Sequence, residues 1–527
     1  MPPLAEKIPD RLGWRALGDA SAIFALLPED ITAACTTDCT PERCDNATVR
    51  PCEPPELEPG LPGQFVPLEV PHRPAEVLEL PRQPVDLFFD FVPAELVGRW
   101  VKWTNAGPPS ARLGPAQRRS RSLLWKPTTS DELYLFLGIL IYMGIHPEAE
   151  VARYWSVQQD REDPIHPFTR LMTRDRFQLL FRRVRIFDAA LITAPTRPTP
   201  GGRGRDPRES RMPKVYKQVN EWSAHIQETG DRFLRPGSDL TVDEAMVRFT
   251  GRSMETTTIP TKPIPQGFKV WVLAQKGYCL RWLWHVHGDG PYGLVPQARP
   301  AAGDQAARKT ALTPTQLVVT SLLALLPLAT YHVFLDNLFA SVKLFRALRD
   351  PKIGATGTCR KDGGIDKTLV AEKETEADGQ VNQFTWKDNA LVLFLTTVFD
   401  ETSEVVRNRR RPAGNTAAKK AAREVFGPDV RKDLRIPLAV DEYNHRMNGV
   451  DTSDQSRSYY DFNRPVRRGS WQALAWNFLL EVIIINTFLL QQWGNPDYPR
   501  IKTQLEWPGA ATEGNRPPER DGPVAIT

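Results

Sequence analysis

The sequence has 527 residues, of which 41% are hydrophobic and 9% are aromatic, including 14 Trp. This length and composition predict a globular protein of two to four folded units with disordered ends, and exclude a chain without a packed core. The net charge is only +5, but Lys and Arg gather in runs within residues 118–121, 174–185, 407–435 and 464–468. Such runs make local positive patches of the kind that contact nucleic acid.

The sequence offers no sign of secretion or of a membrane partner. No basic segment followed by a continuous apolar run occurs near the N-terminus, so no signal peptide is expected. The longest apolar runs, 133–145 and 478–490, are shorter than a membrane span requires. Six cysteines argue against a disulfide framework. We expect a soluble intracellular protein, in which incidental thiols are favoured over a zinc site at Cys35, Cys39, Cys44 and Cys52.

Helical patterns dominate the first part of the chain. Residues 1–84 are rich in Pro and Glu, which predicts a disordered leader. From Val85 onwards apolar residues recur at helical spacing, and Thr129–Glu132 has the sequence of a capping box. This box would open a buried apolar helix over 133–145. A further amphipathic helix is expected over 216–230.

A basic amphipathic helix is expected over residues 173–187. Its apolar residues share one face, and the arginines lie largely on the others: Arg174, Arg182, Arg183 and Arg185 among them. Two interpretations stay equally open here, a solvated surface and a surface that contacts phosphates.

Strand patterns replace the helical ones after Gly237. Three strands are expected first, followed by helix, strand, helix and strand, over residues 240–249, 268–274, 283–287, 315–326, 331–335, 341–348 and 353–358. This is the order of the RNase H-like fold, although many α/β domains share parts of it. Residues 362–436 interrupt the order with a strand over 390–398 and ten Lys or Arg between Arg407 and Arg435. An insertion with a basic arm is expected, and a disordered loop is the alternative for the basic run.

Carboxylates stand at three separate places in this pattern. Asp243 lies inside the first expected strand, and Asp336 ends the fourth. Asp451 and Asp454 are three residues apart, which puts them on one face of a helix. Taken singly, each acid has an ordinary explanation as a cap or a solvated side chain. Taken together they favour a cluster, because strands one and four are neighbours in an RNase H-like sheet.

An oxygen-only cluster of this kind favours Mg²⁺ or Mn²⁺ over zinc, because hard cations prefer carboxylate and water oxygens. Two such ions can activate a water or a 3′-hydroxyl and stabilise the leaving oxygen of a phosphodiester.

Several motifs follow one another in a specific order over residues 85 to 495. They are 131–145 with Gly138 and Met143-Gly144, Tyr154-Trp155, 172–187 with Asp188, Thr241-Val-Asp-Glu-Ala-Met-Val-Arg-Phe-Thr-Gly-Arg-Ser253, Lys262-Pro263 with Gly267-Phe268-Lys269, 335–341, 354–360, and Tyr443-Asn444 with 447–455. No single motif is specific, but in this order they resemble the piggyBac-type DDE transposases and the host proteins derived from them.

The resemblance implies roles for particular residues. Asp243, Asp336 and Asp451 stand at the family's catalytic, metal-binding aspartates, and Asp454 stands at a further acidic position that matters for activity. The cofactor implied is Mg²⁺ or Mn²⁺, as two ions. The positions implied to contact DNA are Arg174, Arg182, Arg183, Arg185, Lys262, Lys269, Arg360, Arg464, Arg467 and Arg468.

The resemblance also implies an activity and its partners. The activity is metal-dependent hydrolysis at a transposon end, hairpin formation by the freed 3′-hydroxyl, and joining into TTAA targets. The partners are double-stranded DNA with terminal inverted repeats and a second copy of the chain, in the nucleus. The chain departs from many family transposases because no cysteine follows Cys359, which leaves the recognition of transposon ends open. A DNA-binding host protein without catalysis and a structure-selective nuclease are the alternative functions.

The architecture implied is an α/β protein built around an RNase H-like, mixed-sheet catalytic core. The expected units are a leader over 1–84, a split helical DNA-binding and dimerisation domain over 85–236 and 457–508, the core over 237–361 and 437–456, an insertion domain over 362–436, and a flexible tail over 509–527.

Overall fold

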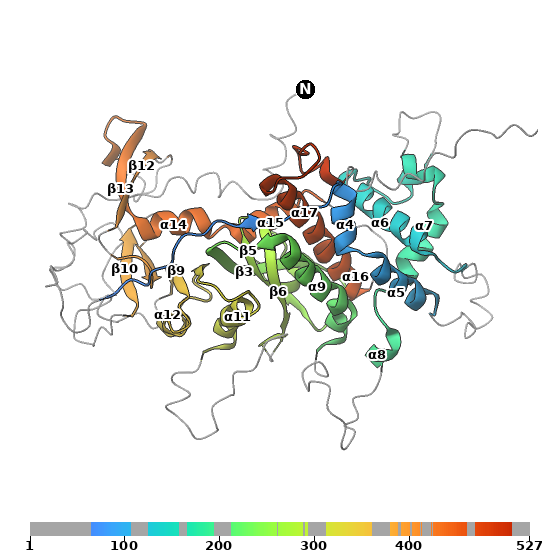
Figure 1. Ribbon diagram of the computed structural model, residues 1–527, viewed down its shortest axis with the longest axis horizontal. Helices are drawn as coiled ribbons and strands as arrows, with labels where there is room; N and C mark the ends of the chain where they lie inside the picture. The colour runs from blue at the N-terminus through green and yellow to red at the C-terminus, as the bar shows by residue number, and fades with distance from the viewer. Residues whose placement is uncertain are drawn as a thin grey trace, which may run out of the picture.

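The centre of the computed structural model is a mixed β-sheet of nine strands in the described part of the chain (Figure 1). The structure describes residues 65–106, 125–156, 166–193, 212–260, 262–287, 290–292, 312–360, 380–387, 391–400, 403–411, 413, 423, 425–460 and 469–508. The four N-terminal cysteines, Arg464, Arg467, Arg468, the tail from 509 and most of the expected leader therefore lie outside the described residues.

Strand order defines the fold class. The main path runs β10-β11-β9-β8-β3-β5-β6-β7, and β4 pairs with β5. Strands β3, β5 and β6 pair antiparallel, whereas β3, β8 and β9 are parallel. The order β6-β5-β3-β8-β9 confirms the RNase H-like core. The strand bounds are β3 Asp239–Arg248, β4 Thr256–Thr258, β5 Gln266–Gln275, β6 Tyr278–Val286, β7 Gly290–Tyr292, β8 His332–Leu335, β9 Gly354–Cys359, β10 Asn382–Lys387 and β11 Leu391–Thr396.

Both faces of this sheet are covered. Successive residues of a strand point to opposite faces, and nearly every residue of β5 and β6 is buried. Three helices, α9 Lys214–Phe233, α15 Gly449–Arg457 and α17 Glu481–Trp493, pack against β6. Helix α15 also packs on β3 and β5. The bounds of the helices that follow or adjoin the sheet are α11 Pro314–Leu323, α12 Val342–Arg349, α14 Leu438–Arg446 and α15 Gly449–Arg457.

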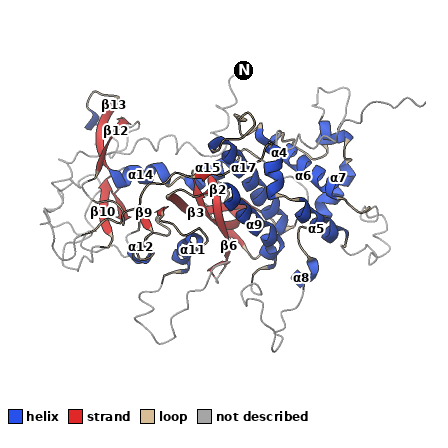
Figure 2. Ribbon diagram, in the orientation of Figure 1, coloured by secondary structure: helices blue, strands red, loops and turns tan. Residues whose placement is uncertain are grey.

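A helical unit lies beside the sheet and is built from two distant parts of the chain (Figures 1 and 2). Trp222 contacts Trp100 and Trp476 with ring centroids 5.0 and 6.0 Å apart. This aromatic contact joins the N-terminal helices to the C-terminal ones. The bounds are α4 Pro84–Phe91, α5 Ala94–Asn105, α6 Ser130–Ile145, α7 Arg174–Arg183, α8 Ala189–Thr193, α9 Lys214–Phe233, α16 Ser470–Leu474, the π-helical turn η6 Ala475–Leu480 and α17 Glu481–Trp493. Two 3₁₀ turns, η4 Arg153–Trp155 and η5 Pro167–Arg170, and the paired strands β1 Glu76–Val77 and β2 Leu234–Arg235 complete this side.

The C-terminal helices form one apolar rod, Ser470–Trp493. Its 24 residues are long and apolar enough to cross a membrane, but 89% of the most apolar window is buried inside the protein. The rod is therefore a core helix of this fold.

The basic helix and the expected capping box differ from the predictions in detail. Thr129 caps α6 by accepting a hydrogen bond from the Glu132 backbone N–H. The Glu132 carboxylate does not complete the box; it accepts from Thr128 and pairs with Arg176. Helix α7 ends at Arg183 rather than near residue 187, because Thr104 holds the next residues extended: its Oγ1 accepts from the Arg185 backbone N–H at 3.0 Å.

The expected insertion is only partly a separate unit. Strand β11 pairs antiparallel with β9, so the hairpin β10–β11 extends the central sheet. Strands β12 Glu404–Arg410 and β13 Arg431–Pro437 pair with each other, so the basic residues within these two strands are not in a disordered loop. Lys419 and Lys420 of the same basic run lie outside the described residues. A small second core joins both pairs of strands to α14: Trp386, Phe394, Phe426, Leu434, Ile436 and Val440.

Candidate active site

Two of the predicted aspartates lie side by side, just beyond the parallel pairing of two strands. Strands β3 and β8 run parallel, and Val242 pairs with Leu335 as the last residues in register. Asp243 and Asp336 follow that pair directly, at the same edge of the sheet. The strand order that the sequence predicted thus brings together two acids that are 93 residues apart.

Helix α15 brings the third aspartate to the same edge. It packs on β3 so closely that a Cβ on Gly449 would lie 2.9 Å from Thr241 Oγ1, and only glycine fits there without movement. Thr241 Oγ1 in turn donates to the Arg446 carbonyl at 2.6 Å. The first turn of α15 carries Asp451. Asp451 is therefore held beside the strand that carries Asp243.

The three carboxyl groups share an unfavourable environment. Burial raises the pKa of Asp243 well above its usual range, and the charges of Glu244 and Asp336 raise it further. Burial is also the main cause that raises the pKa of Asp336 and of Asp451. A group of acids in this state gains free energy from any cation that binds to it.

Glu244 is a member of this cluster that the sequence reasoning missed. Its carboxylate oxygens lie 3.2 Å from Lys262 Nζ and 3.7 Å from Lys269 Nζ. Glu244 pairs with Trp271 across the β3–β5 ladder and Lys269 stands diagonally to it, so strand pairing was the signal that could have found this contact. Lys269 Nζ also lies 4.0 Å from the centroid of the Trp271 ring.

The two lysines therefore face the carboxylates in this structure. Burial by itself would lower the pKa of Lys262, but the charges of Asp243, Glu244 and Asp451 raise it. Burial lowers the pKa of Lys269. Both lysines were predicted to contact DNA, and that role stays a prediction.

Tyr443 is a second residue that the predicted site did not include. Its hydroxyl lies 3.3 Å from Thr358 Oγ1. Burial raises the pKa of Tyr443, and the charges of Asp336, Asp243 and Asp451 add to the effect. The phenol therefore stays protonated beside all three acids, where it can donate a hydrogen bond.

Asp454 is placed differently from the other three acids. One of its carboxylate oxygens accepts from Arg457 Nη2 at 2.6 Å. Arg457 is only 5% exposed and lies at the end of the same helix. The charge of Asp454 is thus already paired within α15.

Comparison with known proteins decides the family. The family model described as Transposase IS4, which represents the piggyBac-type transposases, matches residues 83–488, more than half of the chain. The chain belongs to the piggyBac-type transposase family. Enzymes of this family cut and join DNA strands and generally use divalent metal ions.

Individual relatives are distant. The human PiggyBac transposable element-derived protein 3 is 24% identical over 79% of this chain, and human PiggyBac transposable element-derived protein 2 is 23% identical over 69%. These matches span only 62% and 56% of the lengths of the two relatives. A solved structure, a piggyBac transposase synaptic complex with hairpin DNA, has the same fold: the TM-score is 0.59 at 20% identity, over 84% of this chain and 82% of that one.

The three clustered carboxylates have the chemistry that a divalent cation requires. Asp243, Asp336 and Asp451 offer only oxygen donors, and all three have raised pKa values that a cation would relieve. Among the described residues, no group of three His, Cys, Asp or Glu side chains is already arranged to hold a metal ion.

A basic cavity in the helical unit gathers three of the arginines predicted to contact DNA. Arg182, Arg183 and Arg185 line it together with Lys214, and its volume is about 460 Å³. Burial and the neighbouring charge of Arg185 lower the pKa of Arg183, as expected where cations crowd together. Arg174 is exposed and does not line this cavity. Arg360 stands apart from it, donating to Asn337 Oδ1 at 3.2 Å near Asp336.

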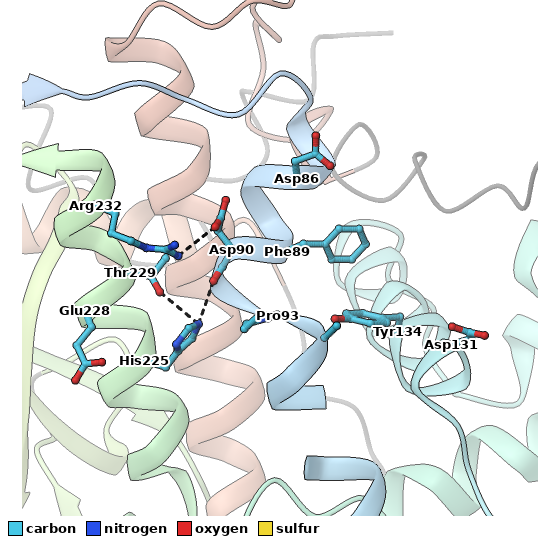
Figure 3. A pocket seen from close by; sticks show the side chains of 11 residues that line it. Asp86, Phe89, Asp90, Pro93, Asp131, Tyr134, His225, Glu228, Thr229 and Arg232 are labelled. Carbon is cyan, nitrogen blue, oxygen red and sulfur yellow. Dashed lines mark hydrogen bonds and ion pairs between the residues drawn. The ribbon is translucent and has the colours of Figure 1, made fainter. Parts of the chain in front are cut away.

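A larger cavity, about 800 Å³, lies elsewhere, and none of the four predicted aspartates lines it (Figure 3). It is formed between α4, α6 and α9. Figure 3 shows Arg232 paired with Asp90, and the His225 ring bonded to the Asp90 carbonyl oxygen and to Thr229. The size of a cavity therefore does not mark the chemistry of this protein.

Proposed function

We propose that this protein is a DNA transposase, or a host protein derived from one, that cleaves and joins DNA strands with the help of Mg²⁺ or Mn²⁺. One observation carries the proposal: β3, β8 and α15 bring Asp243, Asp336 and Asp451 to one sheet edge, where burial raises the pKa of each. A fold uses such a costly arrangement for function more often than for stability.

The side chains of the cluster have separable roles in this proposal. Asp243, Asp336 and Asp451 would hold two divalent ions through their carboxylate oxygens. When bound, these ions supply the Lewis acidity that activates a water or 3′-hydroxyl and stabilises a leaving oxygen. Lys262 adds positive charge beside the acids, where a phosphate could approach. Tyr443 stays protonated and offers a hydrogen-bond donor at the edge of the site.

The DNA partner is supported by charge on the helical unit. The cavity formed by Arg182, Arg183, Arg185 and Lys214 has no acid among the described residues that line it, which suits it to phosphate groups. We include in the proposal the terminal repeats and TTAA targets, a homodimer and a nuclear location, together with DNA contacts at Arg174, Lys262, Lys269, Arg360, Arg464, Arg467 and Arg468.

Asp336→Ala tests the catalytic proposal. The substrate is a DNA hairpin whose tip carries TTAA, and the assay measures Mg²⁺-dependent opening and, in parallel, DNA affinity. We expect Asp336→Ala to abolish opening and to leave the affinity within a few fold, because Asp336 serves the metal site and not the basic surface. The exposed acid Asp350, at the end of α12, provides the matched control Asp350→Ala.

Opening that survives Asp336→Ala would overturn the assignment of the site. Wild-type protein that binds this DNA tightly but never opens it with Mg²⁺ or Mn²⁺ would favour the alternative, a DNA-binding host protein without catalysis.

A further inference from the structure

Helix α15 carries an ion network behind the face that meets the carboxylate cluster. Arg457, its last residue, donates through Nη2 to Asp454 Oδ1, and its Nη1 lies 3.6 Å from Glu481 Oε2. The guanidinium carbon is 5.1 Å from the centroid of the Phe478 ring. Glu481 and Phe478 are both buried and belong to the C-terminal rod of the helical unit. One arginine therefore joins the catalytic helix to the helical unit.

Further contacts fix α15 between the sheet and the same rod. The Ser453 hydroxyl lies 3.0 Å from the Cys279 thiol on β6. Asn486 on α17 bonds both backbone groups of Cys279, accepting from its N–H at 3.0 Å and donating to its carbonyl at 2.9 Å. Strand β6, helix α15 and helix α17 thus interlock. The Arg457 network is the ionic part of this junction.

Asp454 faces this junction. Asp451 and Asp454 are almost one helical turn apart, so both cannot move independently of the helix that carries them. One oxygen of Asp454 accepts a hydrogen bond from a buried arginine, and losing either partner removes this bond from the network that holds the helix. Loss of either partner would let the helix shift, and Asp451 would shift with it.

We propose that Arg457 is a positioning residue: together with Asp454 and Glu481 it fixes helix α15 so that Asp451 stands at the carboxylate cluster. Asp454 acts through Arg457 and is not a metal ligand. This inference rests on the proposed function, because it names the residues that position a ligand of the proposed metal site. It also explains why an acid three residues after a metal ligand would matter for activity.

The test measures metal binding directly on the full chain. Mn²⁺ affinity is measured by calorimetry, and amide hydrogen exchange is followed over residues 449–457. Arg457→Met should weaken Mn²⁺ binding by roughly 10- to 100-fold, the usual effect of removing a residue that orients a ligand. It should also speed exchange in α15. Arg457→Lys keeps the charge without the planar fork, so it should recover part of both losses.

Arg281 provides a matched control. It is 7% exposed and forms a bidentate pair with Asp231 at 2.5 and 2.7 Å, which ties β6 to α9. Among the described residues, none of its hydrogen bonds or ion pairs reaches α15. Arg281→Met should lower thermal stability but leave Mn²⁺ affinity and α15 exchange as in wild type. If Arg457→Met does not fold, the comparison of Arg457→Lys with Arg281→Lys decides.

A double substitution separates the two roles of Asp454. If Asp454 acts through Arg457, Asp454→Asn with Arg457→Met should weaken Mn²⁺ binding no more than Arg457→Met alone. If Asp454 were a ligand, the two losses would multiply and the inference would fail. Unchanged affinity and exchange in Arg457→Met would overturn it as well. Wild-type protein that binds Mn²⁺ but does not cleave DNA would end the proposed function and leave this inference standing.

Discussion

Two buried groups of charges in this protein are built in opposite ways. Asp441, on α14, is fully buried, and Arg407 holds it with two hydrogen bonds of 3.0 and 2.6 Å. Arg409 and His445 lie 3.9 and 3.5 Å from the same carboxylate. Asp243 is 7% exposed, but within the described part of the chain its one hydrogen bond comes from the Glu244 backbone N–H, and its neighbours include Glu244 and Asp336. The first acid has its counter-charges, and the second has mainly like charges.

The contrast separates structure from function. An acid surrounded by arginines holds a hairpin, here β12–β13, to the rest of the molecule. An acid surrounded by acids weakens the fold unless something binds it. The carboxylate cluster is therefore the one of these two groups that a bound cation would stabilise. Substitutions in the two groups should therefore change stability in opposite directions.

Asp441→Asn should give the largest effect, a loss of several degrees in the midpoint of thermal unfolding. The amide cannot balance the charges of Arg407 and Arg409, so the variant leaves positive charge crowded beside a buried position. Differential scanning calorimetry measures the loss. Asp433→Asn, at an exposed acid on β13 that accepts from Asn408, is the matched control and should have little effect. Equal unfolding midpoints for the two variants would show that the Asp441 charge does not stabilise the fold.

Asp243→Asn should act in the other direction and stabilise the metal-free protein at neutral pH. The raised pKa of Asp243 means that its favourable contribution is complete below its ordinary value of 3.8 and is lost as the pH rises through the raised value. The gain of the variant over wild type should therefore grow as the pH rises above about 4. Each unit of the shift is worth about 1.4 kcal/mol.

Urea unfolding at pH 5 and pH 8, without divalent ions, measures this gain. The same experiment on Asp441→Asn is the control, and its sign should be reversed. A variant that is less stable than wild type at pH 8 would show that Asp243 is a structural acid like Asp441.

Sequence periodicity predicted most of the core because buried strands and helices repeat apolar residues at fixed spacing. It failed where a charge interrupts an apolar run. Strand β6 begins at Tyr278, five residues before the predicted start, and Arg281 lies in the missed part. The charge of that buried arginine is paired by Asp231, which lies on a helix and is 50 residues away in sequence. The local sequence around a strand cannot predict a charged partner that lies so far away in the chain.

The same limit applied to the site. The order of the strands was enough to predict that Asp243 and Asp336 are neighbours, because the two strands pair in parallel and each acid follows the last paired residue of its strand. Helical spacing could have predicted the pairing of Asp454 with Arg457, since the two residues are three positions apart. The contact of Glu244 required the register of β3 against β5, and the contact of Glu481 required knowing which helices pack together; residue spacing alone gives neither.

Lys262→Met removes a positive charge beside the carboxylate cluster and should have the smallest effect on stability of the substitutions considered. Lys262 is the lysine nearest to Glu244, and its side chain is about one-third exposed, so solvent screens its attraction to the acids. We expect a loss below about 1 kcal/mol at pH 7. The raised pKa of Lys262 means that its contribution is complete below 10.5 and is lost as the pH rises through the raised value.

The contribution should also fade at acidic pH, because the acids that attract Lys262 then become protonated. Urea unfolding at pH 4, 7 and 11 would thus show the largest loss at pH 7. Lys269→Met is the control with a different sign of shift, because burial lowers the pKa of Lys269. A Lys262→Met variant that loses the same stability at all three values would mean that the methylene stem, and not the charge, holds this residue in place. Lys262 would then not act as a counter-charge of the carboxylate cluster, and the need of the cluster for a bound cation would be greater.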